Sequence, residues 1–262
     1  MQDLRISLIQ DELVWEDPAA NRARFQAILE SMEDTDLVLL PEMFSTGFTV
    51  HPQRVAESMD GTTIQWLRRM ARESGKAMAG SLIVKEGESY YNRLVFCHPD
   101  GALEHYDKRH LFRMGGEHLR FGMGNHNIMV NYRGWKIRPL ICYDLRFPVW
   151  ARNRYSEGNY DYDLLLYLAN WPRARRHHWM TLLSARAIEN QCYVAGLNRV
   201  GTDGAGVSYS GDSRVIGPGG EEITVAGEEA PCVLRATLSA EALSGIRNRF
   251  QVALDWDPFS ID

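Results

Sequence analysis

Short apolar runs, each bounded by polar or turn residues, most constrain the folds open to this chain. Runs of this kind predict buried β-strands, and they cover residues 4–9, 37–40, 77–84, 137–143, 164–169 and 193–197. Between them lie segments with apolar residues at three- and four-residue spacing, which predict helices over residues 20–32, 63–74 and 179–190. Strands followed by helices imply crossover connections, so the sequence predicts an α/β fold.

The pattern is interrupted where two strand-like runs flank a turn. Residues 77–84 and 91–97 enclose a Glu-Gly-Glu-Ser stretch, and residues 213–216 and 223–225 enclose Gly-Pro-Gly-Gly. Both patterns favour antiparallel hairpins. We therefore expect a mixed sheet system with helices outside it. Because no repeat, linker or low-complexity tract divides the chain, we expect one domain over residues 1–262.

The charge balance argues against a polyanionic partner. The chain carries a net charge of −5, so no overall basic field would hold nucleic acid or an anionic membrane surface. The N-terminus lacks the basic and apolar stretches of a signal peptide, and no apolar run approaches the roughly 18 residues of a membrane span. The four cysteines form no C-x-x-C pair, which favours free thiols in the cytoplasm. A small molecule or a protein is the expected partner.

Cys142 ends one of the predicted strands, just before a charged turn and Pro148, which can open a helix. At such a strand-to-helix elbow, backbone N–H groups can hold an oxyanion and are expected to lower the pKa of a thiol, which suits a nucleophile. The same pattern also fits a buried structural cysteine, because free cysteine often packs as a small hydrophobic residue. We interpret Cys97, Cys192 and Cys232 in that second way.

Two further polar residues follow predicted strands. Glu42 comes directly after the run at residues 37–40, where α/β folds assemble their sites, and a carboxylate there can act as a general base. Lys108 follows the hairpin that includes residues 91–97, and a fixed ammonium group could stabilise an oxyanion. Taken singly, each also fits an ordinary residue, an exposed loop glutamate and a surface lysine.

Other polar clusters predict neither a metal nor a cofactor. The histidines form no tight ligand pair of the H-E-x-x-H kind. The glycine-rich stretch at residues 201–206 lacks the lysine of a phosphate loop and predicts a surface turn. The basic run of Arg173, Arg175 and Arg176 is typical of a solvated helix start.

Considered together, the candidate residues stand in three segments that resemble the catalytic signatures of the nitrilase superfamily, in the same order. The segments are LLPEMF with Glu42, YDKRHLF with Lys108 and ICYDLRFP with Cys142. A fourth segment, GGEHLRFGMG, resembles the part of that family that carries a second active-site glutamate, here Glu117. Further similarity in ANWP and SARAIENQ extends the resemblance over nearly the whole chain.

The resemblance implies an α-β-β-α sandwich, a cofactor-free mechanism and a set of roles. Cys142 would attack the substrate, Glu42 would move protons, and Lys108 with the backbone N–H of Tyr143 would hold the oxyanion. Glu117 would position the substrate or keep Lys108 and Glu42 correctly ionised. A thioester would form and be hydrolysed without a metal. Members of the superfamily commonly assemble as homodimers or larger homo-oligomers.

Within the superfamily, the segment FSTGF that follows Met43 resembles the version found in bacterial omega-amidases. These enzymes hydrolyse the terminal amide of small 2-oxo dicarboxylic acid monoamides such as 2-oxoglutaramate and 2-oxosuccinamate. The far carboxylate of such a substrate needs a cationic anchor, for which Arg146 and Arg173 are the candidates. Arg146 fits equally well as the ion-pair partner of a nearby acid. Phe48 and Trp171 would narrow the pocket, although Trp171 could instead be a packing residue.

Three functions therefore remain open from the sequence. The first is hydrolysis of a small linear amide. The second is a related reaction, on a nitrile or an N-carbamoyl compound or with transfer of the acyl group. The third is a non-catalytic interaction protein that keeps the fold. The set of Glu42, Lys108, Glu117 and Cys142 argues against the third, because a binding module has no use for it.

Overall fold

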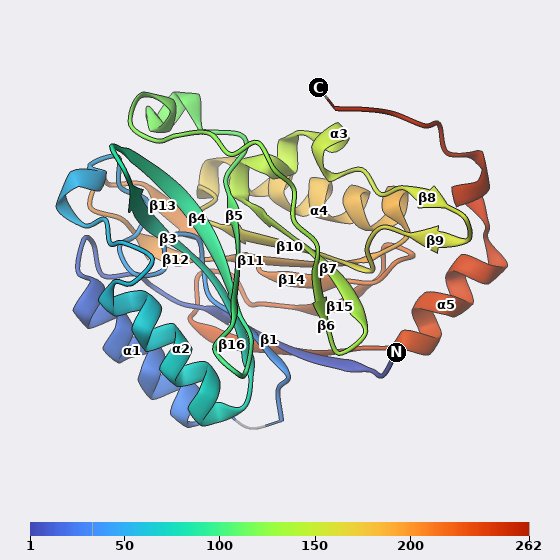
Figure 1. Cartoon of the computed structure of the whole chain (residues 1–262), viewed down its shortest axis with the longest axis horizontal. Coiled ribbons are helices and arrows are strands. Elements are labelled where there is room, and N and C mark those ends of the chain that lie inside the picture. Colours follow the sequence, from blue (N-terminus) through green and yellow to red (C-terminus); the bar gives the residue numbers. More distant parts are fainter. Residues whose placement is uncertain (33, 262) are drawn as a thin grey trace.

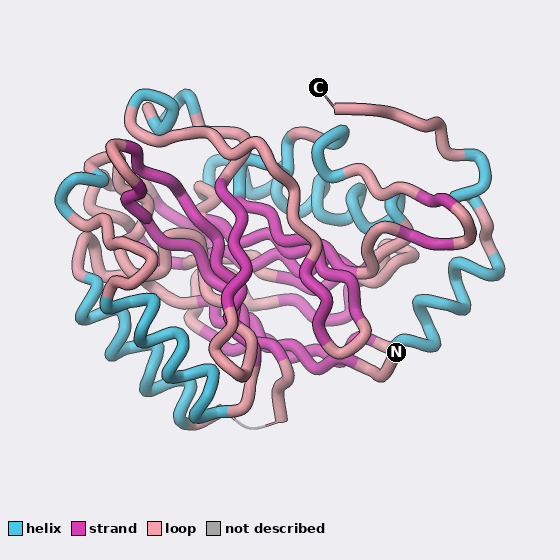
Figure 2. Tube along the Cα trace, in the orientation of Figure 1, coloured by secondary structure: helices cyan, strands magenta, loops and turns pink. Residues whose placement is uncertain are grey.

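A computed structural model describes residues 1–32 and 34–261, and within them the chain forms two six-stranded β-sheets that pack face to face. Helices lie on the outer faces of both sheets (Figure 1), and a trace coloured by secondary structure shows the strands gathered at the centre (Figure 2). The predicted α/β class and the α-β-β-α sandwich are confirmed.

The first sheet contains the strands that precede Glu42 and Lys108 in the chain. In spatial order its strands are β16 (Cys232–Leu238), β1 (Leu4–Gln10), β2 (Leu37–Leu39), β3 (Ala77–Glu86), β4 (Ser89–Cys97) and β5 (Leu103–Asp107). The central strands β1, β2 and β3 run parallel. Strands β16, β4 and β5 are antiparallel to their neighbours.

The second sheet contains the strands that precede Cys142 and Asn170. In spatial order its strands are β15 (Glu222–Val225), β14 (Arg214–Ile216), β11 (Tyr193–Asn198), β10 (Leu164–Ala169), β7 (Trp135–Ile141) and β6 (Val130–Tyr132). Strands β7, β10 and β11 run parallel. Two short antiparallel pairs lie outside the two sheets: β8 (Tyr155–Ser156) with β9 (Asn159–Tyr160), and β12 (Val200–Thr202) with β13 (Ser208–Ser210).

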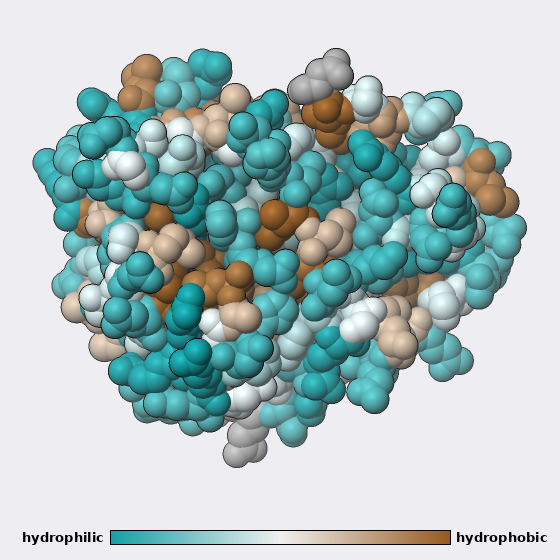
Figure 3. All heavy atoms as spheres, viewed as in Figure 1, coloured by the Kyte–Doolittle hydropathy of each residue, from teal (hydrophilic) through white to brown (hydrophobic). Residues whose placement is uncertain are grey.

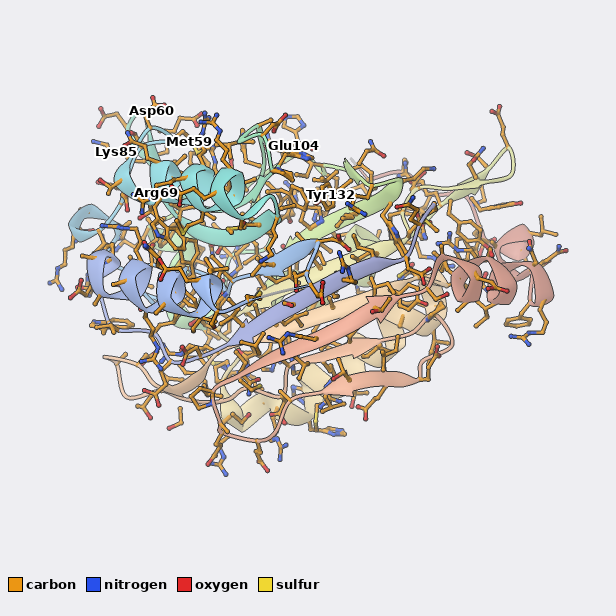
Figure 4. The ribbon with its side chains drawn as sticks, turned by 90° about the horizontal axis from the view of Figure 1, so that it is seen from below. Met59, Asp60, Arg69, Lys85, Glu104 and Tyr132 are labelled. Atoms are coloured by element: carbon orange, nitrogen blue, oxygen red, sulfur yellow. The ribbon has the colours of Figure 1, made fainter. Side chains whose placement is uncertain are left out.

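The α-helices are α1 (Pro18–Glu30), α2 (Thr62–Ser74), α3 (Pro148–Ala151), α4 (Arg176–Asn190) and α5 (Ala240–Arg249). Helices α1 and α2 cover the first sheet, and α4 covers the second. The view from below shows these helices on opposite sides of the strands, with Arg69 marking α2 and Glu104 marking the edge strand β5 (Figure 4).

Local sequence explains where α1 and α2 begin and end. Pro18 opens α1 after Asp17, whose side chain accepts a hydrogen bond from the N–H of Ala20. Gly75 ends α2 in the left-handed conformation, with a φ of 67° that glycine adopts without strain.

The interior strands are buried on both faces, which accounts for their continuous apolar sequences. Every residue of β2 and β10 is buried. One large apolar cluster fills the space between the sheets and continues under α4, and a second packs α1 and α2 onto the first sheet. The outer surface in the space-filling view is mostly hydrophilic, with smaller apolar areas between (Figure 3).

The strands and helices predicted from the apolar pattern are all present, with some boundaries moved. Strand β7 ends at Ile141, and Cys142 begins a 3₁₀ helix instead of ending the strand. Helix α4 begins at Arg176, earlier than the predicted residue 179. None of the helices in the described part of the chain is long and apolar enough to cross a membrane.

Candidate active site

Cys142 lies at a sharp elbow between β7 and a 3₁₀ helix (Cys142–Arg146). Its backbone has a φ of 40°, in the left-handed region that residues other than glycine rarely occupy. Such strain costs of order 1–3 kcal/mol and clusters at functional sites. Because Tyr143 lies in the first turn of the 3₁₀ helix, its N–H has no acceptor within that helix. This N–H can therefore bind an oxyanion beside the thiol.

Glu42, Lys108 and Glu117 form a buried cluster of charges. The Lys108 Nζ donates to Glu42 Oε1 at 2.8 Å and to the two carboxylate oxygens of Glu117 at 3.1 and 3.0 Å. None of the three residues is more than 1% exposed. One ammonium group thus holds two carboxylates where solvent does not screen their attraction.

The second oxygen of Glu42 is held by the other sheet. Asn170, which follows β10, donates from its backbone N–H to Glu42 Oε2 at 2.8 Å and from its side chain to the Glu42 carbonyl oxygen at 2.6 Å. The Cys142 thiol contacts the same carboxylate. The structure therefore brings together the four residues that the sequence assigned to the reaction, Glu42, Lys108, Glu117 and Cys142.

The charge state of the cluster follows from these contacts. Burial alone would lower the pKa of Lys108, but the charges of Glu117 and Glu42 raise it above its usual value, so the ammonium group stays protonated. Burial raises the pKa of Glu117; Lys108 opposes this shift, and the charge of Glu42 adds to it. A proton delivered to the cluster is therefore accepted by a carboxylate.

The thiol of Cys142 differs from the sequence-based prediction, which expected a lowered pKa. The pKa of Cys142 is raised well above its usual value, first because the side chain is buried and second because Glu42 is negatively charged. Lys108 opposes this shift, but two carboxylates already share its charge. The backbone N–H groups at the elbow therefore do not lower the pKa of the thiol enough to offset the increases caused by burial and by the charge of Glu42. Cys142 therefore rests as a neutral thiol beside a carboxylate that can accept its proton.

A buried network beneath the elbow fixes its position. The fully buried carboxylate of Asp144 accepts hydrogen bonds from the N–H of Ile141 at 3.0 Å and from the hydroxyl of Tyr106 at 2.8 Å. It also accepts one from the N–H of His110 at 3.0 Å. Tyr106 and His110 flank Lys108 in the sequence. The network therefore ties the lysine segment to the nucleophile elbow.

A cavity of about 340 Å³ opens beside Cys142, and four of the five predicted substrate-binding residues line it: Phe48, Tyr143, Arg146 and Trp171. Trp171 also packs on Trp179, with 5.5 Å between ring centroids, so it serves both of the roles considered for it. Much of the remaining wall is apolar or aromatic, and the polar groups are few, as is usual for small-molecule sites.

Arg146 lines the cavity without an acidic partner. Its guanidinium group stacks over the Trp171 ring, 4.8 Å from the centroid, and contacts His178 Nδ1 at 3.1 Å. Within residues 1–32 and 34–261, no carboxylate lies within ion-pairing distance of Arg146. The alternative that Arg146 serves as the ion-pair partner of a nearby acid is therefore wrong.

The prediction for Arg173 needs correction. Its side chain is half exposed, pairs with Glu229 and does not line the cavity. Arg175 lines the cavity instead and stacks over the ring of Phe112, 5.3 Å from the centroid. The prediction of a solvated helix start holds for the half-exposed Arg173, whereas Arg175 faces the cavity.

The glycine-rich stretch at residues 201–206 forms the predicted surface turn, with Gly204, Ala205 and Gly206 exposed. The same turn also borders the cavity, which Asp203 and Ala205 line. Asp203 accepts hydrogen bonds from the N–H groups of Ala205 and Val207, both at 2.9 Å. Its other oxygen accepts one from the hydroxyl of Tyr209 at 2.7 Å. These bonds give the loop a defined shape at the cavity wall.

Three residues that complete the site were not recognised in the sequence: Asn92, Asp144 and Asn170. Asp144 and Asn170 had a usable signal, because they lie within the ICYDLRFP and ANWP segments. Asn92 had none, since a single amide within a predicted strand has no distinguishing pattern.

The protein belongs to the carbon-nitrogen hydrolase family, whose sequence profile matches residues 5–248. This match confirms the resemblance to the nitrilase superfamily that the sequence motifs indicated. The charge cluster and the cysteine elbow described above lie within the matched region.

Relatives with defined activities and solved structures extend this result. Omega-amidase YafV of Escherichia coli is 46% identical over 261 residues, 100% of both chains. The 2-oxoglutaramate amidase of Bacillus subtilis is 32% identical over 251 residues, 94% of this chain and 95% of the relative. The crystal structure of a CN-hydrolase superfamily protein from Xanthomonas campestris, with an arsenic adduct in its active site, matches with a TM-score of 0.98 and 48% identity over 100% of both chains.

Proposed function

We propose that this protein is a cysteine-dependent amidase that hydrolyses the terminal amide of small 2-oxo dicarboxylic acid monoamides, such as 2-oxoglutaramate and 2-oxosuccinamate. The observation that carries the proposal is one cavity lined by Cys142, by Lys108 of the charge cluster, and by Arg146, which has no acidic partner among the described residues. The omega-amidase and 2-oxoglutaramate amidase relatives support the same chemistry.

The first half-reaction forms a thioester. Glu42 accepts the proton of the Cys142 thiol while the sulfur attacks the carbonyl carbon of the amide. The negative charge that develops on the carbonyl oxygen is stabilised by the Lys108 ammonium group and the N–H of Tyr143. Glu42 then delivers its proton to the nitrogen, the C–N bond breaks, and ammonia leaves.

The second half-reaction regenerates the enzyme. Glu42 accepts a proton from water while the oxygen attacks the thioester carbon. The same oxyanion donors stabilise the second tetrahedral intermediate, and the C–S bond breaks as the proton on Glu42 returns to Cys142. Because Lys108 remains protonated and Glu42 is fixed at both oxygens, neither group needs to move between the two steps.

Substrate selection follows from the position of Arg146. It lies on the 3₁₀ helix that begins with Cys142, so one short element holds both the nucleophile and a guanidinium group. A guanidinium group binds a carboxylate in two parallel hydrogen bonds and remains charged. Arg175 adds a second positive charge to the same cavity. A small amide with a carboxylate at its other end complements this arrangement.

A substrate panel tests the proposed function. We expect 2-oxoglutaramate to be hydrolysed with a kcat/KM roughly 10²-fold or more above that of a neutral short amide, because the neutral compound has no carboxylate to pair with the half-buried guanidinium group of Arg146. Release of ammonia from 2-oxoglutaramate, succinamate, butyramide, an aliphatic nitrile and an N-carbamoyl amino acid would be measured in parallel. Faster turnover of the nitrile or the carbamoyl compound would exclude the omega-amidase assignment.

A matched pair of arginine variants tests the carboxylate anchor. We expect Arg146→Gln to raise KM for 2-oxoglutaramate by roughly 10-fold or more and to leave the rate with butyramide nearly unchanged, because only the charged substrate loses its partner. Arg173→Gln is the control, since Arg173 pairs with Glu229 outside the cavity. Equal losses with both substrates would show that Arg146 supports the cavity wall and does not anchor the carboxylate.

The proposal also includes a cytoplasmic location and a homo-oligomeric assembly. All four cysteines lie in the described part of the chain and are free thiols, a state that suits a reducing compartment. Exposed apolar side chains on α3, on α4 and after α5, namely Val149, Ile188 and Phe250, offer surface for subunit contacts.

A further inference from the structure

Asn92 contacts every charged member of the cluster. It lies on β4 opposite Ile83, and its side chain is fully buried. Its Nδ2 donates to Glu42 Oε1 at 2.8 Å and to Glu117 Oε1 at 3.1 Å. Its backbone carbonyl oxygen accepts a hydrogen bond from the N–H of Lys108 at 3.0 Å. One uncharged residue therefore fixes the spacing of two carboxylates and the start of the lysine segment.

The orientation of the Asn92 amide is set by Ser81. The Ser81 hydroxyl accepts a hydrogen bond from the N–H of Met43 at 2.8 Å and donates to Asn92 Oδ1 at 2.9 Å. Because the hydroxyl hydrogen is directed at Oδ1, the NH₂ group of Asn92 must face the carboxylates. Met43 follows Glu42 directly, so this chain of hydrogen bonds runs from the residue next to Glu42 back to the Glu42 carboxylate.

An amide is well suited to this place because it donates without adding charge. The NH₂ group has two N–H donors, one for each carboxylate. The two carboxylates share one ammonium group and repel each other, and the charge of Glu42 raises the pKa of Glu117. Hydrogen bonds to the ionised form oppose that tendency, and the contact with Asn92 acts in this direction on the pKa of Glu117.

We propose that Asn92 is a positioning residue that holds the Glu42 carboxylate in place to accept the Cys142 proton and keeps its neighbour Glu117 ionised in the resting enzyme. This inference rests on the proposed function, in which Glu42 transfers that proton. The other titratable groups that face the two carboxylates are Lys108, Cys142 and Tyr209. Backbone N–H groups of Phe112 and Asn170 also donate to the two carboxylates, as does the side chain of Asn170 to Glu42 Oε2 at 3.5 Å.

The pH dependence of turnover in Asn92→Leu tests the inference. Loss of a hydrogen bond to a charged group is expected to move the acid limb of the kcat/KM profile upward by about one pH unit. At neutral pH, kcat should fall roughly 10-fold while KM changes less than about threefold, because Asn92 does not line the cavity. Ser81→Ala removes only the group that orients the amide, so its profile should shift in the same direction by a smaller amount.

Asn153→Leu is the matched control. Asn153 is an equally buried amide whose side chain donates to the carbonyl oxygens of Tyr162 and Asn190, outside the cavity. This variant is expected to lose thermal stability without a change in the pH profile. If folded Asn92→Leu has the wild-type profile, the inference is wrong. If Asn92→Leu does not fold, Ser81→Ala decides, and an unchanged profile in that variant also overturns the inference.

A second measurement separates this inference from the proposed function. Infrared difference titration distinguishes a protonated buried carboxyl group from a carboxylate and requires no substrate. In Asn92→Leu, carboxyl protonation should begin about one pH unit higher than in the wild-type protein. If the substrate panel fails and this shift occurs, the proposed substrate is wrong and the inference stands. If the panel succeeds and the carboxyl titration is unchanged, only the inference is wrong.

Discussion

Replacing Cys142 with alanine is expected to lower turnover of 2-oxoglutaramate by roughly 10⁴-fold or more, because no thioester can form without the thiol. No other cysteine can take its place. Cys97 and Cys192 are fully buried, Cys232 lies on β16, and none of the three lines the cavity. Ammonia release, measured beside circular dichroism of the folded variant, gives the result.

Cys232→Ala is the control for this experiment, since it also removes a thiol and leaves the cavity intact. It should retain wild-type turnover. Activity above about 1% of wild type in Cys142→Ala would mean that a different group attacks the substrate, and the assignment of the nucleophile would then fail.

Glu42→Gln is expected to have two opposite effects. Turnover should fall by roughly 10²-fold or more, because glutamine cannot carry the proton from the thiol to the departing nitrogen. Alkylation of Cys142 by iodoacetamide should become faster at neutral pH. The pKa of Cys142 is raised by burial and by the negative charge of Glu42, and this substitution removes the second cause while Lys108 remains.

The direction of the pH dependence distinguishes the two effects. In the wild-type protein the thiolate forms only as the pH approaches the raised pKa of Cys142, so alkylation should accelerate with increasing pH. In Glu42→Gln the same rise should begin at lower pH. Peptide mapping after timed alkylation would measure both curves. Glu104→Gln, on the edge strand β5, should match wild type in both turnover and alkylation. Slower alkylation in Glu42→Gln would show that Glu42 promotes the resting thiolate.

The strands were predictable from the sequence, but their packing was not. A run such as β10 is apolar throughout because both of its faces are covered, and this marks it as a buried strand without naming its neighbours. Strand β16 comes from the far end of the chain and pairs with β1. Pairing over such a distance leaves no local pattern, so the two-sheet arrangement could be expected only from the family resemblance.

In the active site, too, the sequence identified the reacting residues but not the surroundings that the fold gives them. Glu42, Lys108 and Cys142 could be singled out because each lies within a recognisable segment, Glu42 and Lys108 after a predicted strand or hairpin and Cys142 at the end of one. The sequence predicts Arg173 as an anchor and does not point to Arg175, because it does not show which side of a 3₁₀ turn faces a cavity. The expected low pKa of Cys142 was wrong for a related reason. That prediction considered the backbone N–H groups near the thiol, which lower its pKa. It did not include burial or the Glu42 carboxylate that the fold places beside the thiol, and both raise the pKa.

The buried charge cluster has a consequence for the folding of this protein. Folding must strip water from Glu42, Lys108 and Glu117, and one ammonium group compensates only part of the loss. Apolar side chains of similar volume would make a more stable interior at that place. In return, the dipoles and charges are oriented before any substrate arrives, so the reaction requires little reorganisation of its surroundings. The destabilisation is incurred once for each molecule that folds, and the lowered barrier is available in every catalytic cycle.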